Sequence, residues 1–223
     1  MSLNTLHDPA VSNLLDSLFA DAQRSQGRVA ALVGHLSPAE RAAHMAAPGF
    51  DYRALYGMLK DVHLPVSKRT GQLLYLLARA NRARAVVEFG ASFGISTVHL
   101  AAAVRDNGGG RVIGTEFEPN KLAHARSNLT QAGLSDLVEL REGDALQTLT
   151  HNLPDVIDLV LLDGHKPLYA QILTLLEPRL RAGAYIIADN ADACPEYVAR
   201  VRAADSGYLS LAFDEDVELS LKV

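Results

Sequence analysis

Short apolar runs of strand length alternate with helical segments along residues 64 to 223 of this chain. Strands are expected at Ala85–Phe89, Arg111–Glu116, Val138–Arg141, Ile157–Asp163 and Ala184–Asp189. Helices are expected around Lys68–Ala80, Ser96–Val104, Asn120–Ala132, Ala145–Leu153 and Pro167–Leu180. Because such alternation implies parallel pairing through right-handed crossovers, it predicts an α/β protein with a doubly wound, mostly parallel sheet.

The end of the chain follows a different pattern. After a helix near Pro195–Ala204, two strand-like runs, Tyr208–Phe213 and Val217–Val223, are separated only by Asp214-Glu215-Asp216. Because three residues are too few for a crossover, this pair is expected to form an antiparallel hairpin at the sheet edge. The sheet would then have seven strands.

Residues 1–63 contain only helical patterns and are predicted to form an N-terminal helical appendage to a domain at residues 64–223. A stripe at helical spacing consists of Val11, Leu14, Leu15, Leu18 and Ala22. Ser37-Pro38-Ala39-Glu40 has the residues of a helix capping box, and Gly49 stands where that helix should stop. A third helical piece is expected from Asp51 to about His63. The appendage is interpreted as a lid or a homodimer surface.

Composition narrows the class of protein. The 223 residues are 48% hydrophobic and 21% charged, which suits one globular domain with a full core. The net charge of −5 argues against a nucleic-acid partner, and the single cysteine excludes an internal disulfide. The polar start and the lack of a membrane-length apolar run make a cytoplasmic enzyme with a small-molecule acceptor the expectation.

A glycine turn follows the first expected strand. Gly90 and Gly94 bracket the turn, and Ser96 lies in the helix start that follows. Glycines at this position let backbone amides approach a ligand, and a helix N-terminus favours negative charge. The Gly-x-x-x-Gly spacing differs from the dinucleotide pattern Gly-x-Gly-x-x-Gly, so alone it is a weak signal.

Every one of the five expected parallel strands has an acid at or near its carboxyl end, where open α/β sheets bind ligands. Each acid alone could serve a turn or a helix cap. Together they indicate a functional edge, and they are Glu88, Glu116, Asp144, Asp163 and Asp189.

These motifs resemble class I S-adenosylmethionine-dependent methyltransferases, and within them the cation-dependent O-methyltransferases of the catechol and caffeoyl-CoA type. The resemblance covers about residues 64–223 and implies a Rossmann-like methyltransferase fold. It implies cofactor binding by Val66, Glu88, Gly90, Ser92, Gly94, Ser96, Glu116, Asp144, Ala145 and Asp163. It also implies a divalent cation on Asp163, Asp189 and Asn190, with Lys166 acting on the substrate hydroxyl.

The chemistry of the last four residues points the same way. Two carboxylates and an amide oxygen form a hard, oxygen-only set that suits Mg²⁺ best, with Mn²⁺ or Ca²⁺ as alternatives. Beside that charge Lys166 could have a lowered pKa and act as general base. A solvated helix-start lysine is the alternative, and the pair of carboxylates favours the catalytic role. The predicted reaction is methyl transfer to a hydroxyl of a small catechol-like or hydroxylated metabolite.

Three features depart from the family pattern. His165 stands where the animal catechol enzymes have tryptophan, their substrate-binding glutamate aligns near Leu209, and the loop before the last helix is only Ala191–Cys194. A nicotinamide-dependent oxidoreductase, a non-catalytic cofactor-binding protein and a tRNA hydroxyuridine methyltransferase therefore remain alternatives.

Overall fold

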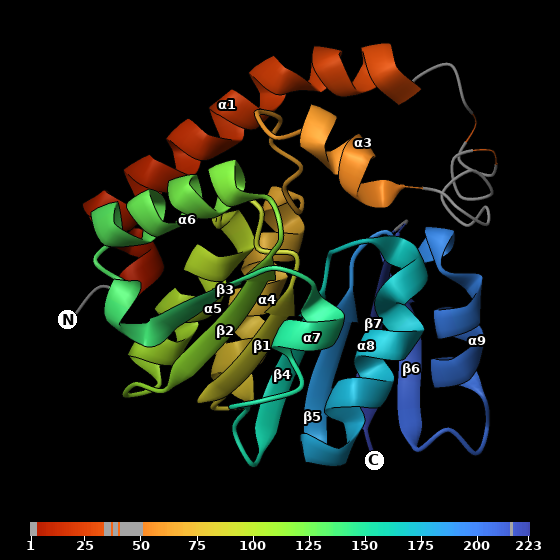
Figure 1. The fold of residues 1–223 in the computed structure, drawn as a ribbon. Coiled ribbons are helices and arrows are strands. Elements are labelled where there is room, and N and C mark those ends of the chain that lie inside the picture. The colour runs from red at the N-terminus through yellow and green to blue at the C-terminus, as the bar shows by residue number, and fades with distance from the viewer. Residues whose placement is uncertain (1–3, 34–36, 38–39, 41–50, 215) are drawn as a thin grey trace.

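A computed structural model describes residues 4–33, 37, 40, 51–214 and 216–223. It contains a seven-stranded sheet in the order β3-β2-β1-β4-β5-β7-β6 (Figure 1). The strands are β1 Ala85–Phe89, β2 Arg111–Glu116, β3 Val138–Glu142, β4 Ile157–Leu162, β5 Leu180–Ala188, β6 Tyr208–Phe213 and β7 Val217–Lys222. The first five pair in parallel, whereas β7 is antiparallel to both β5 and β6. The doubly wound sheet and its terminal hairpin are confirmed.

Helices cover both faces of this sheet (Figure 1). The helices are α1 Pro9–Val33, α3 Tyr52–Met58, α4 Lys68–Ala80, α5 Ile95–Asp106, α6 Pro119–Gln131, α7 Ala145–Thr148, α8 Tyr169–Leu176 and α9 Pro195–Arg202. Successive strand residues face opposite layers: Val86 packs in one core with α1, α4, α5 and α6, and Val87 in a second core with α7, α8 and α9. Both residues are completely buried.

The apolar stripe of α1 packs into the first of these cores. Val11, Leu14, Leu15 and Leu18 are all buried there beside residues of α4 and α5. The carboxylate of Asp106 accepts hydrogen bonds from Thr5 Oγ1 at 2.5 Å and from the Tyr75 hydroxyl at 2.6 Å. These bonds hold the segment before α1 against α4 and α5. The stripe is therefore covered within the chain. The homodimer and the boundary at residue 63 stay predictions.

The predicted capping box is present in the two described residues that define it. Ser37 N donates to Glu40 Oε2 at 2.8 Å, and Glu40 N donates to Ser37 Oγ at 3.2 Å. Gly49, the expected stop signal, lies outside the described residues.

The helix after β3 is shorter than predicted, because α7 ends at Thr148 rather than Leu153. The guanidinium of Arg141 donates to the carbonyls of Thr148, His151 and Asn152 at 2.6 to 2.8 Å. Those carbonyls are satisfied without another helical turn, so the chain leaves the helix early.

The helix expected at Pro167–Leu180 is also shorter. Three-residue 3₁₀ turns, Lys166–Leu168 and Glu177–Arg179, flank α8 and contain prolines that lack an N–H donor. β5 correspondingly begins at Leu180 rather than Ala184, with an irregularity between the pairs Ile157–Leu180 and Leu159–Tyr185.

None of the helices in the described part of the chain is long and apolar enough to cross a bilayer. The cytoplasmic location stays a prediction.

Candidate functional site

The carboxyl ends of the five parallel strands lie in a row along one edge of the sheet. Backbone hydrogen bonds hold neighbouring ends in register: Asp163 N donates to Phe89 O at 2.8 Å, and Asp189 N to Leu162 O at 2.9 Å. The strand order therefore places Asp144, Glu116, Gly90, Asp163 and Asp189 in that sequence along the edge. Strands are spaced by about 4.8 Å, so Asp144 and Asp163 stand three spacings, roughly 14 Å, apart.

The turn after β1 passes so close to β4 that only glycine can occupy its first position. Gly90 has φ +99°, and a Cβ there would lie 2.5 Å from the carbonyl oxygen of Asp163. Gly94 has φ +86° and begins α5 against Ala125. The Gly-x-x-x-Gly spacing thus reflects a close backbone approach beside the edge.

A cavity of about 540 Å³ opens along this edge. Six of the ten predicted cofactor-binding residues line it, together with all predicted metal and catalytic residues. They are Gly90, Ser92, Glu116, Asp144, Ala145, Asp163, Lys166, Asp189 and Asn190. Tertiary structure thus brings together side chains from all five strand ends.

Glu116 is fixed by the backbone around it. Its carboxylate accepts hydrogen bonds from the amides of Ser92, Phe117 and Glu118, each at 2.9 Å. Burial raises the pKa of Glu116, and these amides oppose that shift. The side chain is rigid and presents its remaining acceptor capacity to the cavity.

Four predicted cofactor residues do not line the 540 Å³ cavity. Glu88 is completely buried and accepts hydrogen bonds from Ser96 Oγ and Thr97 Oγ1, each at 2.5 Å. Burial raises the pKa of Glu88 to about 7. Ser96 borders a small adjoining hollow, Val66 faces a different cavity, and Gly94 packs on Ala125. Glu88 therefore stabilises the turn between β1 and α5 through these two hydrogen bonds.

Asp163 and Asp189 place two carboxyl groups in a buried setting where their charges interact. Burial, followed by the charge of Asp163, raises the pKa of Asp189 to about 8. Asn190 donates its Nδ2 to Asp216 at 2.9 Å, which leaves its side-chain oxygen for another partner. Within the described residues no three His, Cys, Asp or Glu side chains gather as a metal site, so the candidate set has only two carboxylates and one amide.

Lys166 lies against this acidic pair. Its Nζ donates to Asp163 Oδ1 at 3.1 Å, and both side chains are nearly enclosed. Burial alone would lower the pKa of Lys166, but Tyr169, Asp163, Tyr56 and Asp189 together hold it well above its ordinary value. A lowered pKa is predicted for Lys166 beside a bound cation; with the protein residues alone the direction is the opposite.

An aromatic cluster over the cavity was missed in the sequence. Tyr52 stacks on His165 with ring centroids 4.5 Å apart, and both Tyr52 and Tyr56 form T-shaped ring pairs with Phe117. Arg53 forms an ion pair with Asp144 at 3.0 Å, which ties α3 to the start of α7. Tyr52 and Tyr56 are four residues apart, a spacing that places both side chains on one face of a helix and that could have indicated this cluster.

A second cavity, of about 520 Å³, meets the first at Asp189 and Asn190. Side chains of α1, including Phe19 and Gln23, form one of its walls. Asp216, from the loop between β6 and β7, also borders it, whereas Leu209 lies exposed on β6. The acid of this hairpin that lies near the site is therefore Asp216, and the alignment to Leu209 did not find it.

Known proteins resemble this chain in sequence. The family described as "Methyltransferase domain" matches residues 87–191. A catechol O-methyltransferase of Mycobacterium tuberculosis is 38% identical over 127 residues, 57% of this chain and 57% of that protein. A catechol O-methyltransferase of Sus scrofa is 30% identical over 152 residues, 64% of this chain and 80% of that protein.

A solved structure is also similar to this chain. The crystal structure of cofactor-bound Rv0187 from MTB is 28% identical with a TM-score of 0.67, and the match covers 84% of this chain and 98% of that one. The matches span only 57–58% of the length of two bacterial catechol O-methyltransferases.

Strand order β3-β2-β1-β4-β5-β7-β6, with a cavity at the carboxyl ends of the parallel strands, defines a class I methyltransferase fold. The 30% identity to the Sus scrofa protein, over 80% of that protein's length, shows the family to which this chain belongs. This chain belongs to the catechol O-methyltransferase family.

Proposed function

We propose that this chain is an S-adenosylmethionine-dependent O-methyltransferase. The acceptor is a hydroxyl group of a small catechol-like or hydroxylated metabolite, and a divalent cation, Mg²⁺ first, assists. The observation that carries this proposal is the single cavity that Glu116, Lys166 and the set Asp163, Asp189 and Asn190 all line. The catechol O-methyltransferase relatives support the reaction class.

The order of groups along the edge orients the cofactor. Asp144 and Ala145 would lie beside the adenine, Glu116 would accept hydrogen bonds from the ribose hydroxyls, and the turn at Gly90 would face the methionine part. This order directs the sulfonium toward Asp163 and Asp189. The roughly 14 Å between Asp144 and Asp163 suits an extended nucleoside with an amino-acid tail.

Asp163, Asp189 and Asn190 fit a divalent cation on the evidence of their own chemistry. Two buried carboxyl groups whose charges interact repel one another when ionised, and this repulsion adds to burial in raising the pKa of Asp189. Asp216 holds the amide of Asn190 so that its oxygen stays available. A bound cation would neutralise these carboxylates, orient an acceptor hydroxyl and lower the pKa of that hydroxyl.

Lys166 would contact the acceptor oxygen. In its neutral form, after releasing its own proton to solvent, it would receive the hydroxyl proton. As an ammonium it would instead donate a hydrogen bond to an acceptor oxygen whose proton has already passed to solvent. The oxygen then forms a bond to the methyl carbon, the carbon–sulfur bond breaks, and its electron pair remains on sulfur as S-adenosylhomocysteine.

The acceptor would enter through the second cavity. That cavity shares Asp189 and Asn190 with the first, so an acceptor there would reach the proposed cation from the side opposite the adenine end. The wall formed by α1 gives the N-terminal helix a part in acceptor choice.

The test combines binding with turnover. Calorimetry should show binding of S-adenosylhomocysteine and none of NADH. With S-adenosylmethionine and Mg²⁺, a panel of catechols and simple phenols should yield methyl ethers. Binding of NADH alone would favour an oxidoreductase, and cofactor binding without turnover on any hydroxyl compound would favour a non-catalytic protein.

A further inference from the structure

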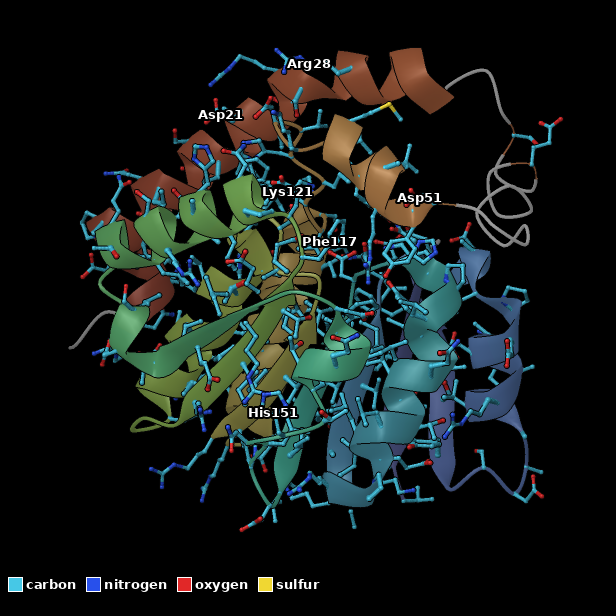
Figure 2. The ribbon with its side chains drawn as sticks, in the orientation of Figure 1. Asp21, Arg28, Asp51, Phe117, Lys121 and His151 are labelled. Carbon is cyan, nitrogen blue, oxygen red and sulfur yellow. The ribbon has the colours of Figure 1, made fainter. Side chains whose placement is uncertain are left out.

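Lys121 is a buried cation that the proposed reaction does not use. It lies in the first turn of α6, is only 3% exposed, and lines the 540 Å³ cavity. Figure 2 labels it near Phe117, at the end of the molecule that α1 and α3 cover. Its Nζ stands 5.8 Å from the centre of the Phe93 ring.

No hydrogen bond or ion pair to the described residues satisfies this ammonium. The carboxylate of Glu116 is held by three backbone amides. Glu118 Oε2 accepts from the backbone N–H of Lys121, at 2.9 Å, and so caps the helix instead of pairing with the ammonium. A charge removed from water without a partner is costly, and a contact with an aromatic ring offsets only part of that cost.

The place of Lys121 along the strand edge determines which part of the cofactor its ammonium would meet. Its ammonium interacts with the charges of Glu116, Glu118 and Asp163, so it lies near the stretch of the edge between ribose and methyl group. The helix N-terminus adds partial positive charge on the same side. The nucleoside part of S-adenosylmethionine carries no anion, whereas its amino-acid tail carries one carboxylate.

We propose that Lys121 binds the α-carboxylate of the methionine part of the cofactor. This inference rests on the proposed function. It also gives the residue a selective role: nucleosides without the amino-acid tail would leave the ammonium unpaired and would bind weakly.

The experiment compares two ligands by calorimetry, S-adenosylhomocysteine and 5′-methylthioadenosine, which lacks the amino-acid tail. Lys121→Met should weaken binding of S-adenosylhomocysteine by roughly tenfold to hundredfold, the loss of a charge-assisted hydrogen bond. Binding of methylthioadenosine should change less than about threefold. Lys121→Arg should restore much of the loss, and the exposed Lys60→Met should change neither affinity.

Equal losses for both ligands would assign Lys121 a structural role, and an unchanged affinity for S-adenosylhomocysteine would overturn the proposal. If Lys121→Met fails to fold by circular dichroism, Lys121→Gln is measured in the same way. Wild-type protein that binds neither ligand would instead contradict the proposed function, so the two failures are distinguishable.

Discussion

The ammonium of Lys166 lies 3.1 Å from the carboxylate of Asp163, although the side chains are only 12% and 10% exposed. Asp189 interacts with the charges of both Asp163 and Lys166 and shares their buried setting. The three groups therefore form one electrostatic unit, and a change in any one alters the others. This relationship underlies the first two predictions.

Lys166→Met is expected to lower kcat by roughly 10²–10⁴, the usual contribution of a positioned general acid or base. The affinity for S-adenosylhomocysteine should change much less than kcat, because Lys166 reaches the cofactor set only through Asp163, while Glu116 and the glycine turn lie elsewhere along the edge. Steady-state kinetics with calorimetry measure both. Lys60→Met, an exposed lysine, is the control, and full activity of the Lys166 variant would remove it from the mechanism.

Chelation with EDTA is expected to abolish methyl transfer, and Mg²⁺ should restore it. Asp189→Ala should reproduce the chelated state, because one of only two carboxylates in the proposed set is lost. Asp192→Ala, an exposed acid in the next turn, should remain active. Full turnover in chelator on every accepted substrate would show that the acidic set is structural.

Glu116→Gln is expected to weaken cofactor binding by roughly tenfold or more, because a charged acceptor for the ribose hydroxyls is lost while the shape is kept. The exposed Glu142→Gln, on the next strand, is the control. Calorimetry with S-adenosylhomocysteine measures the effect. An unchanged affinity would place the ribose away from β2.

Glu88 is expected to make stability depend on pH. Burial raises its pKa from 4.5 to about 7 in the folded state. Below pH 4.5 it is protonated in both states; between pH 4.5 and 7 only the unfolded state ionises freely. As the pH rises from 4.5 to 7, the free energy of unfolding should therefore fall by roughly 3 kcal/mol through the ionisation of Glu88 alone.

Urea unfolding of wild type and Glu88→Gln across pH 4.5–7 tests this. The variant should lack that part of the decline, so its stability relative to wild type should increase with pH. Glu196→Gln, an exposed glutamate in α9, should follow the wild-type profile. Parallel profiles for wild type and Glu88→Gln would contradict the buried, protonated carboxyl.

Gln23→Ala is expected to raise KM for the acceptor roughly twofold to tenfold, the loss of one neutral hydrogen bond. KM for S-adenosylmethionine should stay constant, because Gln23 borders only the second cavity. Arg24→Ala, its exposed neighbour on α1, is the matched control. If Gln23→Ala raises neither KM, the acceptor does not use the wall formed by α1.

Local physical chemistry encodes much of this protein in its sequence. The five parallel strands appear as apolar runs because both faces of each strand are buried, as Val86 and Val87 show. The three-residue link before Val217 allows only a hairpin. The acids at the strand ends could be predicted as neighbours, since parallel strands present their carboxyl ends at one edge.

Only tertiary structure decided how these groups act on one another. Glu88 does not line the cavity, because its carboxylate accepts hydrogen bonds from the hydroxyls of Ser96 and Thr97 in α5. The raised pKa of Lys166 comes from acids and phenols on three separate segments. The cover formed by Tyr52 and Tyr56, and the isolation of Lys121, likewise arise from contacts between segments far apart in the chain. Burial and pairing are properties of the assembled fold, and no local pattern of residues contains them.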